Sequence, residues 1–467
     1  MESLFKMFTV QQIAGATGGR IIGQQDRSIS SVATDSRTIN ADELFVALRG
    51  KNFDGHRFIN DAIQKGVQVL LAEERYLKNI YLPSDISCVA VKNSLKALGD
   101  LAAAFRQRFD LPVIAVTGSN GKTTTKEMLA TILSQTASGL KTAGNLNNLI
   151  GLPQMIFRLA PEHRWAVLEM GMSEPGEIDR LAEIASPTIG LLLNAFPAHL
   201  ASMGTVDAIA RAKGELLQRI RKNGLAVVNA DDPRIISLSQ NSSARRISFG
   251  IRRGEVRAEN INTNGLSGVS FQLVTPKGSI PVKLAACGNH FIYNALATAA
   301  ALLDMLSLEE IRDGLAAFRP CAGRFQLEQV GTLRLIDDSY NANPASCSAA
   351  IATLAELKEG HKAFVVLGDM LELGDEEIEL HRRLGAQAAS VADYLYLMGN
   401  LTKNTAQTAA ATGMTEANIM QAENHAEIAQ HIVSKATAGD LILIKGSRGM
   451  KMEQVAQEIR QLASQEN

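Results

Sequence analysis

Short runs of aliphatic residues alternate along most of this chain with longer segments whose apolar positions follow a helical period. In the first hundred residues the runs lie at 43–48, 67–72 and 88–91. Such alternation is typical of parallel sheets whose strands are joined by crossover helices. A helical pattern over 95–108 ends at Asp110-Leu-Pro112, and we predict a domain boundary there because proline disfavours a continuing helix.

The next segment shows the same alternation, and its apolar runs end in polar residues. We predict strands at 113–116, 165–168, 189–193 and 225–228. The polar residues that end them are Thr117, Glu169, Asn194 and Asn229. Ligands of open parallel sheets bind outside the carboxyl ends of the strands, so we expect these side chains to share one site. Between about 245 and 285, turn residues separate short alternating runs, which predicts antiparallel hairpins.

A third block of the same kind follows Arg319-Pro320. Its predicted strands lie at 333–336, 364–367, 394–397 and 441–444, and their ends are again polar or rich in glycine. Three α/β domains fit the 467 residues of the chain, at roughly 100–200 residues per domain.

Composition and charge narrow the class of protein. Hydrophobic residues make up 46% of the chain, which excludes global disorder. The 47 Lys and Arg residues balance 48 Asp and Glu residues, so the net charge of −1 favours neither nucleic acid nor an anionic membrane surface as a partner. No apolar run reaches the roughly 18 residues of a membrane-spanning helix, and the first residues do not form a secretory signal pattern. The four cysteines lack a CxxC pair, so we expect neither a zinc site nor disulfides, in a cytoplasmic protein.

Residues 114–124, Ile-Ala-Val-Thr-Gly-Ser-Asn-Gly-Lys-Thr-Thr, combine a buried strand, a glycine-rich turn and the start of a helix. Backbone amides of such a turn cradle phosphate oxygens, while Lys122 adds a mobile positive charge and Thr123 a hydroxyl for Mg²⁺. The general pattern has a glycine six residues before the lysine, where this chain has Val116, so the loop is a shortened variant. We predict that it binds a nucleoside triphosphate.

Two further side chains follow predicted strands beside this loop. Glu169 stands where an acidic residue commonly holds Mg²⁺ in P-loop enzymes, and a solvated glutamate at a strand end is the alternative. His199 follows the strand at 189–193, and we expect it to bind a metal or a phosphate rather than to be a loop or core histidine.

Lys213 interrupts the apolar face of a predicted helix. Thr205 is a candidate N-cap for a helix over 206–220, and apolar positions at helical spacing surround Lys213. An unpaired ammonium group is costly in such a place. Either the side chain snorkels to solvent, or burial lowers its pKa and the neutral amine reacts with CO₂ to form a carbamate, an anionic ligand for Mg²⁺. The sequence leaves both alternatives open.

With these residues, the chain resembles the Mur ligases, ATP-dependent amide-forming enzymes that build the stem peptide of peptidoglycan. The shared segments span essentially the whole chain and are 117–123, 145–153, 168–171, 194–199, 212–215, 288–294 and 323–325. Three segments match more narrowly the branch that adds D-alanyl-D-alanine: 337–344, 367–374 and 445–453. The branch that adds meso-diaminopimelate carries an Asp-Asn-Pro-Arg motif in its third domain, whereas the lookalike here, Asp231-Asp-Pro-Arg234, lies in the second.

The resemblance implies an α/β protein of three domains, each with its own substrate. A small N-terminal α/β domain, 1–108, would bind the UDP-sugar. A central P-loop domain, 109–320, with a mostly parallel sheet and an antiparallel extension, would bind ATP. A Rossmann-like C-terminal domain, 321–467, would bind the amino acid or dipeptide. The expected UDP-sugar ligands are Ser36 and Arg37, in one of two matching segments, 34–37 and 54–56, and an exposed loop pair is an equal alternative.

The resemblance also implies the remaining site residues. The expected ATP ligands are Thr117, Gly118, Ser119, Asn120, Gly121, Lys122, Thr123, Thr124, Asn148, Asn294, Arg324 and Asp338. For Asn294, capping of a helix start is the alternative. The expected ligands of two Mg²⁺ ions are Thr123 and Glu169 for one, and His199 and carbamylated Lys213 for the other. The expected catalytic residues are Lys122, His199, Lys213 and Arg324, and the acceptor is expected at Tyr340, Asn341, Asn343 and Arg448.

The implied reaction adds D-Ala-D-Ala to UDP-MurNAc-tripeptide, the last cytoplasmic step in building the stem peptide. The tripeptide carboxylate would attack ATP to give an acyl phosphate, from which the dipeptide amine displaces phosphate. We expect a monomer whose domains close to exclude water. The alternatives are a sister ligase that adds another amino acid, a folylpolyglutamate-type ligase, and a P-loop kinase or regulatory NTPase. The third-domain motifs disfavour the two ligases, and the third alternative leaves Lys213 unexplained.

Overall fold

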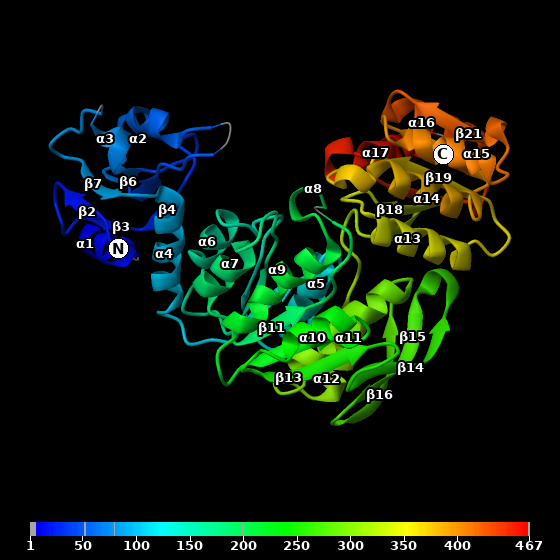
Figure 1. Ribbon diagram of the computed structural model, residues 1–467, viewed down its shortest axis with the longest axis horizontal. Helices are drawn as coiled ribbons and strands as arrows, with labels where there is room; N and C mark the ends of the chain where they lie inside the picture. Colours follow the sequence, from blue (N-terminus) through cyan, green and yellow to red (C-terminus); the bar gives the residue numbers. More distant parts are fainter. Residues whose placement is uncertain (1–5, 51–52, 79, 199, 466–467) are drawn as a thin grey trace.

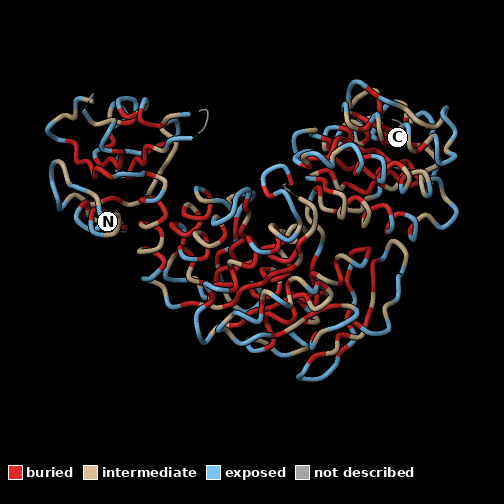
Figure 2. The backbone as a smooth tube through the Cα atoms, viewed as in Figure 1, coloured by how far each residue is buried: buried red, intermediate tan, exposed pale blue. Residues whose placement is uncertain are grey.

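The computed structural model describes residues 6–50, 53–78, 80–198 and 200–465, which form three α/β units (Figure 1). The N-terminal and C-terminal units lie at opposite ends of the central unit, and buried residues concentrate in the middle of each (Figure 2). His199 lies outside the described residues. No helix within the described ranges is long and apolar enough to cross a membrane.

The N-terminal unit is built on a five-stranded sheet of order β2-β7-β6-β5-β4. Its strands are β2 (Arg20–Ile22), β4 (Ser31–Ala33), β5 (Glu43–Val46), β6 (Val69–Glu73) and β7 (Ser87–Val91). The three runs predicted in this region are confirmed as β5, β6 and β7, which pair in parallel because helices carry the chain between them. β1 (Phe8–Thr9) and β3 (Ser28–Ile29) form a separate pair, and the helices are α1 (Val10–Thr17), α2 (Ile59–Gln64), α3 (Glu74–Leu77) and α4 (Ser94–Arg106).

The central unit has a nine-stranded sheet of order β16-β15-β14-β13-β12-β11-β8-β10-β9. Its strands are β8 (Val113–Thr117), β9 (Leu140–Lys141), β10 (Ala166–Glu169), β11 (Ile189–Leu192), β12 (Leu225–Asn229), β13 (Arg245–Gly250), β14 (Val256–Thr263), β15 (Val269–Thr275) and β16 (Gly278–Leu284). The four predicted strands are confirmed as the adjacent, parallel strands β10, β8, β11 and β12. Their carboxyl ends therefore meet at one edge of the sheet, as the polar strand ends predicted.

The hairpins predicted between 245 and 285 are confirmed only for the last part of this segment. β14, β15 and β16 pair antiparallel, but β13 runs parallel to β12, and β14 runs parallel to β13. The prediction is wrong for β13 because α10 (Pro233–Ser239) lies between β12 and β13. This helix carries the chain back to the edge of the sheet where β12 begins, so β13 runs in the same direction, as in any crossover connection.

The central unit has further helices. They are α5 (Lys122–Leu133), α6 (Gly151–Ile156), α7 (Glu177–Ala185), α8 (Leu200–Met203), α9 (Val206–Arg219), α11 (Asn289–Leu302) and α12 (Leu308–Ala317). One of them, α12, packs on α5 and on the antiparallel strand β16. Thr205 is the N-cap of α9, as predicted, and its side chain accepts a hydrogen bond from the Ala208 amide at 3.1 Å.

The C-terminal unit has a six-stranded sheet of order β17-β18-β22-β19-β20-β21. Its strands are β17 (Gln326–Val330), β18 (Leu333–Asp338), β19 (Ala363–Gly368), β20 (Tyr394–Met398), β21 (Ile419–Ala422) and β22 (Leu441–Lys445). The four inner strands match the predicted runs, and β17 and β21 add the two edges. The helices are α13 (Pro344–Leu357), α14 (Glu377–Ala389), α15 (Thr402–Ala411), α16 (His425–Lys435) and α17 (Glu453–Gln465).

α4 joins the first two units as a docked helix. It packs against α6 and α7 of the central unit (Figure 1). The buried Arg106 side chain near its end donates hydrogen bonds to the carbonyl oxygens of Ala185, Phe109 and Leu111, at 3.1, 2.6 and 3.2 Å. These bonds fix the connection at 107–112 against the end of α7.

Candidate active site

The glycine-rich turn 118–121 links β8 to α5, and β8 lies between β11 and β10 in the central sheet. Gly121 has φ +83°, and a Cβ at this position would lie 2.3 Å from Asn294 Oδ1, so the turn requires glycine here. Lys122 Nζ donates to the Gly118 carbonyl at 2.8 Å. Burial lowers the pKa of Lys122, and the Glu169 carboxylate opposes this effect. Asn294 is buried behind the turn and accepts a hydrogen bond from Thr125 Oγ1 at 3.3 Å.

The loop after β11 braces the same turn from the side. Asn194 Oδ1 accepts a hydrogen bond from the Asn120 amide at 2.8 Å, and Asn194 Nδ2 donates to the Asn120 carbonyl at 3.0 Å. Ser119 Oγ donates to the Phe196 carbonyl at 3.0 Å. The side chains of Ser119 and Asn194 thus hold the backbone of the turn in place, while Thr117 is buried and donates to the Met170 carbonyl at 3.0 Å.

Thr123 and Glu169 come together beside the turn. Thr123 Oγ1 donates to Glu169 Oε2 at 2.9 Å, and Glu169 is 3% exposed. Asn147 Nδ2 donates to the other carboxylate oxygen, Oε1, at 2.9 Å. A hydroxyl and a carboxylate next to a phosphate loop fit Mg²⁺, which takes few protein ligands and completes its shell with phosphate and water. No cluster of three or more His, Cys, Asp or Glu that could hold a metal ion occurs among the described residues.

Asn147 was not among the residues predicted from the sequence, and the neighbouring Asn148 stays a predicted ATP ligand. Asn148 Oδ1 accepts hydrogen bonds from the amides of Ile150 and Gly151, at 3.1 and 2.9 Å, where α6 begins. Nothing in the local pattern separates these two asparagines, because Glu169, the partner of Asn147, is 22 positions away along the chain.

Lys213 lies on α9 and is 2% exposed. Among the described residues its amine has no hydrogen-bond or ion-pair partner, and burial together with the charge of Lys122 lowers its pKa well below the usual value. Such burial disfavours the snorkelling alternative and favours a neutral amine.

The C-terminal unit reaches the phosphate loop directly. Arg324 Nη2 donates to Thr123 Oγ1 at 3.3 Å. The amides of Asn343 and Asn120 form a reciprocal pair, in which Asn343 Nδ2 donates to Asn120 Oδ1 at 2.6 Å and Asn120 Nδ2 donates to Asn343 Oδ1 at 3.2 Å. Asn343 is also the N-cap of α13. The predicted ATP and acceptor residues therefore meet at one interface.

The other predicted residues of the C-terminal unit surround a buried ion pair. Lys445 Nζ donates to Asp338 Oδ2 at 2.6 Å and to the Asn341 carbonyl at 3.0 Å. The second oxygen of Asp338 accepts a hydrogen bond from the Phe325 amide at 3.1 Å, and burial raises the pKa of this carboxyl group. Arg448 lies beside this group, with its amide 3.4 Å from Asn341 Oδ1.

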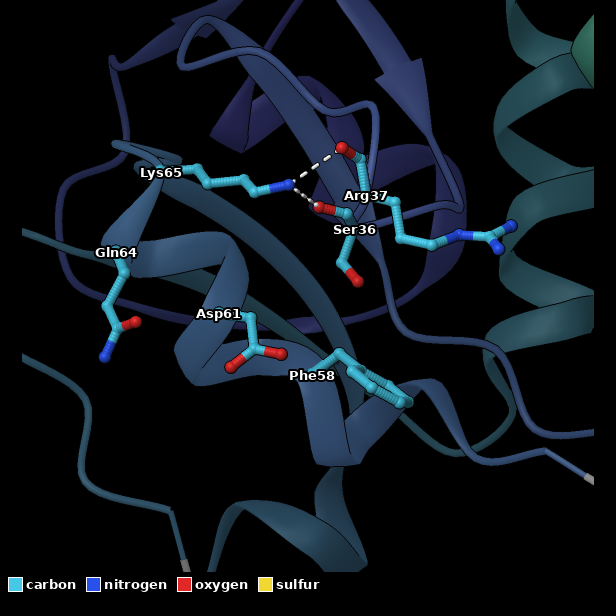
Figure 3. A pocket seen from close by; sticks show the side chains of 6 residues that line it. All are labelled: Ser36, Arg37, Phe58, Asp61, Gln64 and Lys65. Atoms are coloured by element: carbon cyan, nitrogen blue, oxygen red, sulfur yellow. Dashed lines mark hydrogen bonds between the residues drawn. The ribbon is translucent and has the colours of Figure 1, made fainter.

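Ser36 and Arg37 lie apart from this interface, on the N-terminal unit. Together with Phe58, Asp61, Gln64 and Lys65 they line an open cavity of about 360 Å³ (Figure 3). Lys65 Nζ donates to the carbonyls of Ser36 and Arg37, at 2.7 and 2.8 Å, while the Arg37 guanidinium points away and pairs with Asp35 at 2.6 Å. The neighbouring Thr34 Oγ1 accepts a hydrogen bond at 2.9 Å from Gln154 of the central unit.

The other segment that matched the nucleotide-sugar region, 54–56, has a structural role. The buried His56 lies with Nδ1 2.7 Å from Asp54 Oδ1, and its Nε2 accepts a hydrogen bond from the Glu73 amide at 3.0 Å. The Asp-Asp-Pro-Arg lookalike is structural too, since Asp232 is the N-cap of α10 and Arg234 Nη2 donates to the Ala195 carbonyl at 3.1 Å.

Comparison with known proteins adds to this geometry. Three family models match the chain: Mur ligase family, catalytic domain, over 28–106; Mur ligase middle domain, over 116–302; and Mur ligase, glutamate ligase domain, over 323–448. The UDP-N-acetylmuramoyl-tripeptide–D-alanyl-D-alanine ligase of Escherichia coli is 35% identical, over 97% of this chain and 98% of the relative. The enzyme of the same name from Bacillus subtilis is 33% identical, over 97% and 98%.

Solved structures agree with these matches. A crystal structure of MurF from Acinetobacter baumannii is 35% identical and superposes with a TM-score of 0.88, covering 97% of this chain and 99% of that one. MurF ligase from Thermotoga maritima in complex with ADP is 28% identical, with a TM-score of 0.84 over 94% and 98%. The fold is thus the three-domain α/β architecture that the sequence predicted. Since the matches span nearly the whole length at 33–35% identity, the chain belongs to the Mur ligase family.

Proposed function

We propose that this protein is an ATP-dependent ligase that joins D-alanyl-D-alanine to UDP-N-acetylmuramoyl-tripeptide. The observation that carries the proposal is the meeting of the two units at the phosphate loop, where Arg324 contacts Thr123 and Asn343 contacts Asn120. A ligase must bring its activated acyl group and its acceptor amine to one place, and a unit that meets the phosphate loop fits this need. A regulatory NTPase or a kinase does not require such an additional unit. The names of the full-length relatives support the same substrates.

The chemistry begins with the approach of two anions. A carboxylate oxygen of the tripeptide attacks the γ-phosphorus of ATP, the bond to the bridging oxygen breaks, and ADP leaves. The positive charges of Lys122 and Arg324 oppose the repulsion between carboxylate and phosphate and stabilise the transferred group. The free amine of D-Ala-D-Ala then attacks the acyl carbon, the amide bond forms, and inorganic phosphate leaves as the amine loses a proton.

Magnesium supplies charge neutralisation at the phosphates when bound. Thr123 and Glu169 would hold one ion, and Asn147 orients the carboxylate through its hydrogen bond to Oε1. For a second ion we propose His199 and a carbamate on Lys213. The carbamate forms when the neutral Nζ attacks CO₂ and loses a proton, and the burial and lowered pKa of this lysine support that step.

The other substrates are assigned to the flanking units, 1–108 and 321–467. We propose that the acceptor binds at Tyr340, Asn341, Asn343 and Arg448, near Arg324 and the phosphate loop. We propose the cavity beside Ser36 and Arg37 for the UDP end of the other substrate, since it is lined by a cationic lysine and by an aromatic ring. We also propose a cytoplasmic monomer, which sedimentation at 50.2 kDa would support.

One assay tests the function. Phosphate release from ATP is measured with UDP-MurNAc-tripeptide, with and without D-Ala-D-Ala, and the amide product is identified by mass. We expect turnover to require both substrates, and single D-alanine, meso-diaminopimelate and glutamate to fail as acceptors. ATP turnover that is indifferent to the dipeptide would refute the proposal, and turnover with one of the other amino acids would identify a sister ligase.

A further inference from the structure

Two guanidinium groups lie near the ring of Tyr340. Arg324 Cζ is 3.9 Å from the ring centroid, and Arg448 Cζ is 5.5 Å from it. A cation within about 6 Å of an aromatic face is attracted by the negative face of the ring. The backbone supports the closer contact, because the Tyr340 amide donates to the Gly323 carbonyl at 3.1 Å and so holds the two segments together.

Few other contacts fix the position of the Arg324 side chain. Within the described residues, its side chain makes a single hydrogen bond, from Nη2 to Thr123 Oγ1 at 3.3 Å. A long arginine side chain with one weak hydrogen bond retains many rotamers unless packing removes them. The ring at 3.9 Å supplies that packing.

The hydroxyl group of Tyr340 is not used in the same way. In the part of the chain that the structure describes, it forms no hydrogen bond, although the residue is only partly exposed. The contacts that Tyr340 makes are contacts of its ring face and its backbone.

We propose that Tyr340 is a positioning residue, whose ring holds the Arg324 guanidinium against Thr123 at the phosphate loop. This inference deepens the proposed function and rests on it for the identity of the reaction. The ring belongs to the loop after β18, in the segment assigned to the acceptor, and Arg448 lies near the same ring. The same loop therefore sets the position of a cation needed for ATP.

Two variants separate the ring from the hydroxyl group. Tyr340→Phe keeps the aromatic face, and we expect it to lose less of kcat/KM for ATP than a variant without an aromatic ring. Tyr340→Leu removes the face, and we expect kcat/KM for ATP to fall roughly 5- to 30-fold, the range of a cation–π contact. Equal losses in both variants would assign the effect to the hydroxyl group and overturn the proposal, and so would full activity of Tyr340→Leu. If Tyr340→Leu does not fold, as judged by its melting curve, Tyr340→Met takes its place.

A matched control and a double variant test whether the effect passes through Arg324. Tyr394→Leu removes a ring that lies 5.9 Å from Lys362 Nζ in the same unit, and we expect unchanged ATP kinetics. In an Arg324→Lys background, which lacks the planar guanidinium, Tyr340→Leu should cost less than half of its usual factor. A full, multiplicative loss in that background would show that Tyr340 acts independently of Arg324.

Nucleotide binding separates this proposal from the identity of the reaction. The affinity for a non-hydrolysable ATP analogue with Mg²⁺ requires no acceptor, and we expect Tyr340→Leu to weaken it while Tyr340→Phe does not. If the unmodified protein fails to use D-Ala-D-Ala, the proposed function fails, but this binding comparison still decides the role of Tyr340. Equal affinities for all three proteins would overturn the inference.

Discussion

At the scale of single residues, the site leaves polar groups buried without partners. Lys213 is 2% exposed and has no partner among the described residues. An amine kept in such a place costs stability, so its presence there points to chemistry rather than to packing.

Replacing Lys213 with methionine should therefore raise stability and abolish activity. We expect Lys213→Met to stabilise the fold by about 1–3 kcal/mol in CO₂-free buffer without metal, because the burial cost disappears. The folded pKa of Lys213 lies below the unfolded value, so the folded state gains stability as pH rises toward 10.5, and the advantage of methionine should shrink over that range. Thermal melts across pH measure this, with exposed Lys222→Met as the control. A destabilised Lys213→Met would mean that the lysine is already paired.

His290 is a second group of this kind. Within the described residues its Nδ1 is buried without a hydrogen-bond partner, and burial, followed by the charge of Lys445, lowers its pKa from 6.5 to about 4. The unfolded chain then binds a proton between these values while the folded protein does not, so stability falls as pH decreases from 6.5 to about 4. We expect His290→Gln to flatten the melting temperature over this window, while the two proteins run parallel above pH 6.5. Identical slopes below pH 6.5 would contradict a buried neutral histidine.

At the scale of elements, what the sequence predicts depends on how local the signal is. Inner strands such as β8 and β19 are fully buried aliphatic runs, so their composition alone reveals them. The edge strands β17 and β21 are half-exposed and carry polar residues, and no such run marks them.

In the candidate site, too, residues with a local sequence signal could be predicted and residues defined by distant partners could not. The phosphate turn and Glu169 are read from a strand and its end, and the structure brings them together. Asn194 was predicted as a polar strand end, but its hydrogen bond with Asn120 and that of Asn147 with Glu169 could not be predicted, because the partners lie 74 and 22 positions away along the chain.

The reciprocal amide pair is an element-scale contact that a helix cap makes possible. Asn343 caps α13 and at the same time holds Asn120, so the start of this helix fixes the C-terminal unit on the phosphate turn. In Asn343→Ser the shorter side chain should still cap α13 but no longer reach Asn120. We therefore expect an unchanged melting temperature and a several-fold lower kcat/KM for ATP. Asn343→Ala should lose about 1 kcal/mol of stability in addition. Asn120→Ala should add little to Asn343→Ser, since both break one pair. Fully multiplicative losses would show that the two amides act separately.

At the scale of the whole molecule, the three substrates are assigned to three units that are joined differently. The C-terminal unit contacts the phosphate turn through side-chain hydrogen bonds such as that of Asn343 with Asn120, whereas the N-terminal unit is attached through the docked helix α4. Arg180 of α7 pairs with Asp100 of α4 at 2.5 Å, and a Cβ on Gly99 would lie 2.7 Å from Arg180 Nη2, so the two helices are in close contact. We infer that the position of the cavity proposed for the UDP-sugar, relative to the phosphate turn, depends on this contact.

Weakening the contact should then affect one substrate and spare the others. Arg180→Met removes the ion pair between α7 and α4, and we expect a several-fold higher KM for UDP-MurNAc-tripeptide with unchanged KM for ATP and D-Ala-D-Ala. Arg219→Met is the matched control, because Arg219 pairs at 2.6 Å with Asp179 of the same α7 but within the central unit. Steady-state kinetics with each substrate varied in turn would measure the effect, and small-angle scattering would report whether the N-terminal unit samples a wider range of positions. Equal changes in both variants, or a change that falls on ATP, would mean that α4 does not set the distance between the two sites.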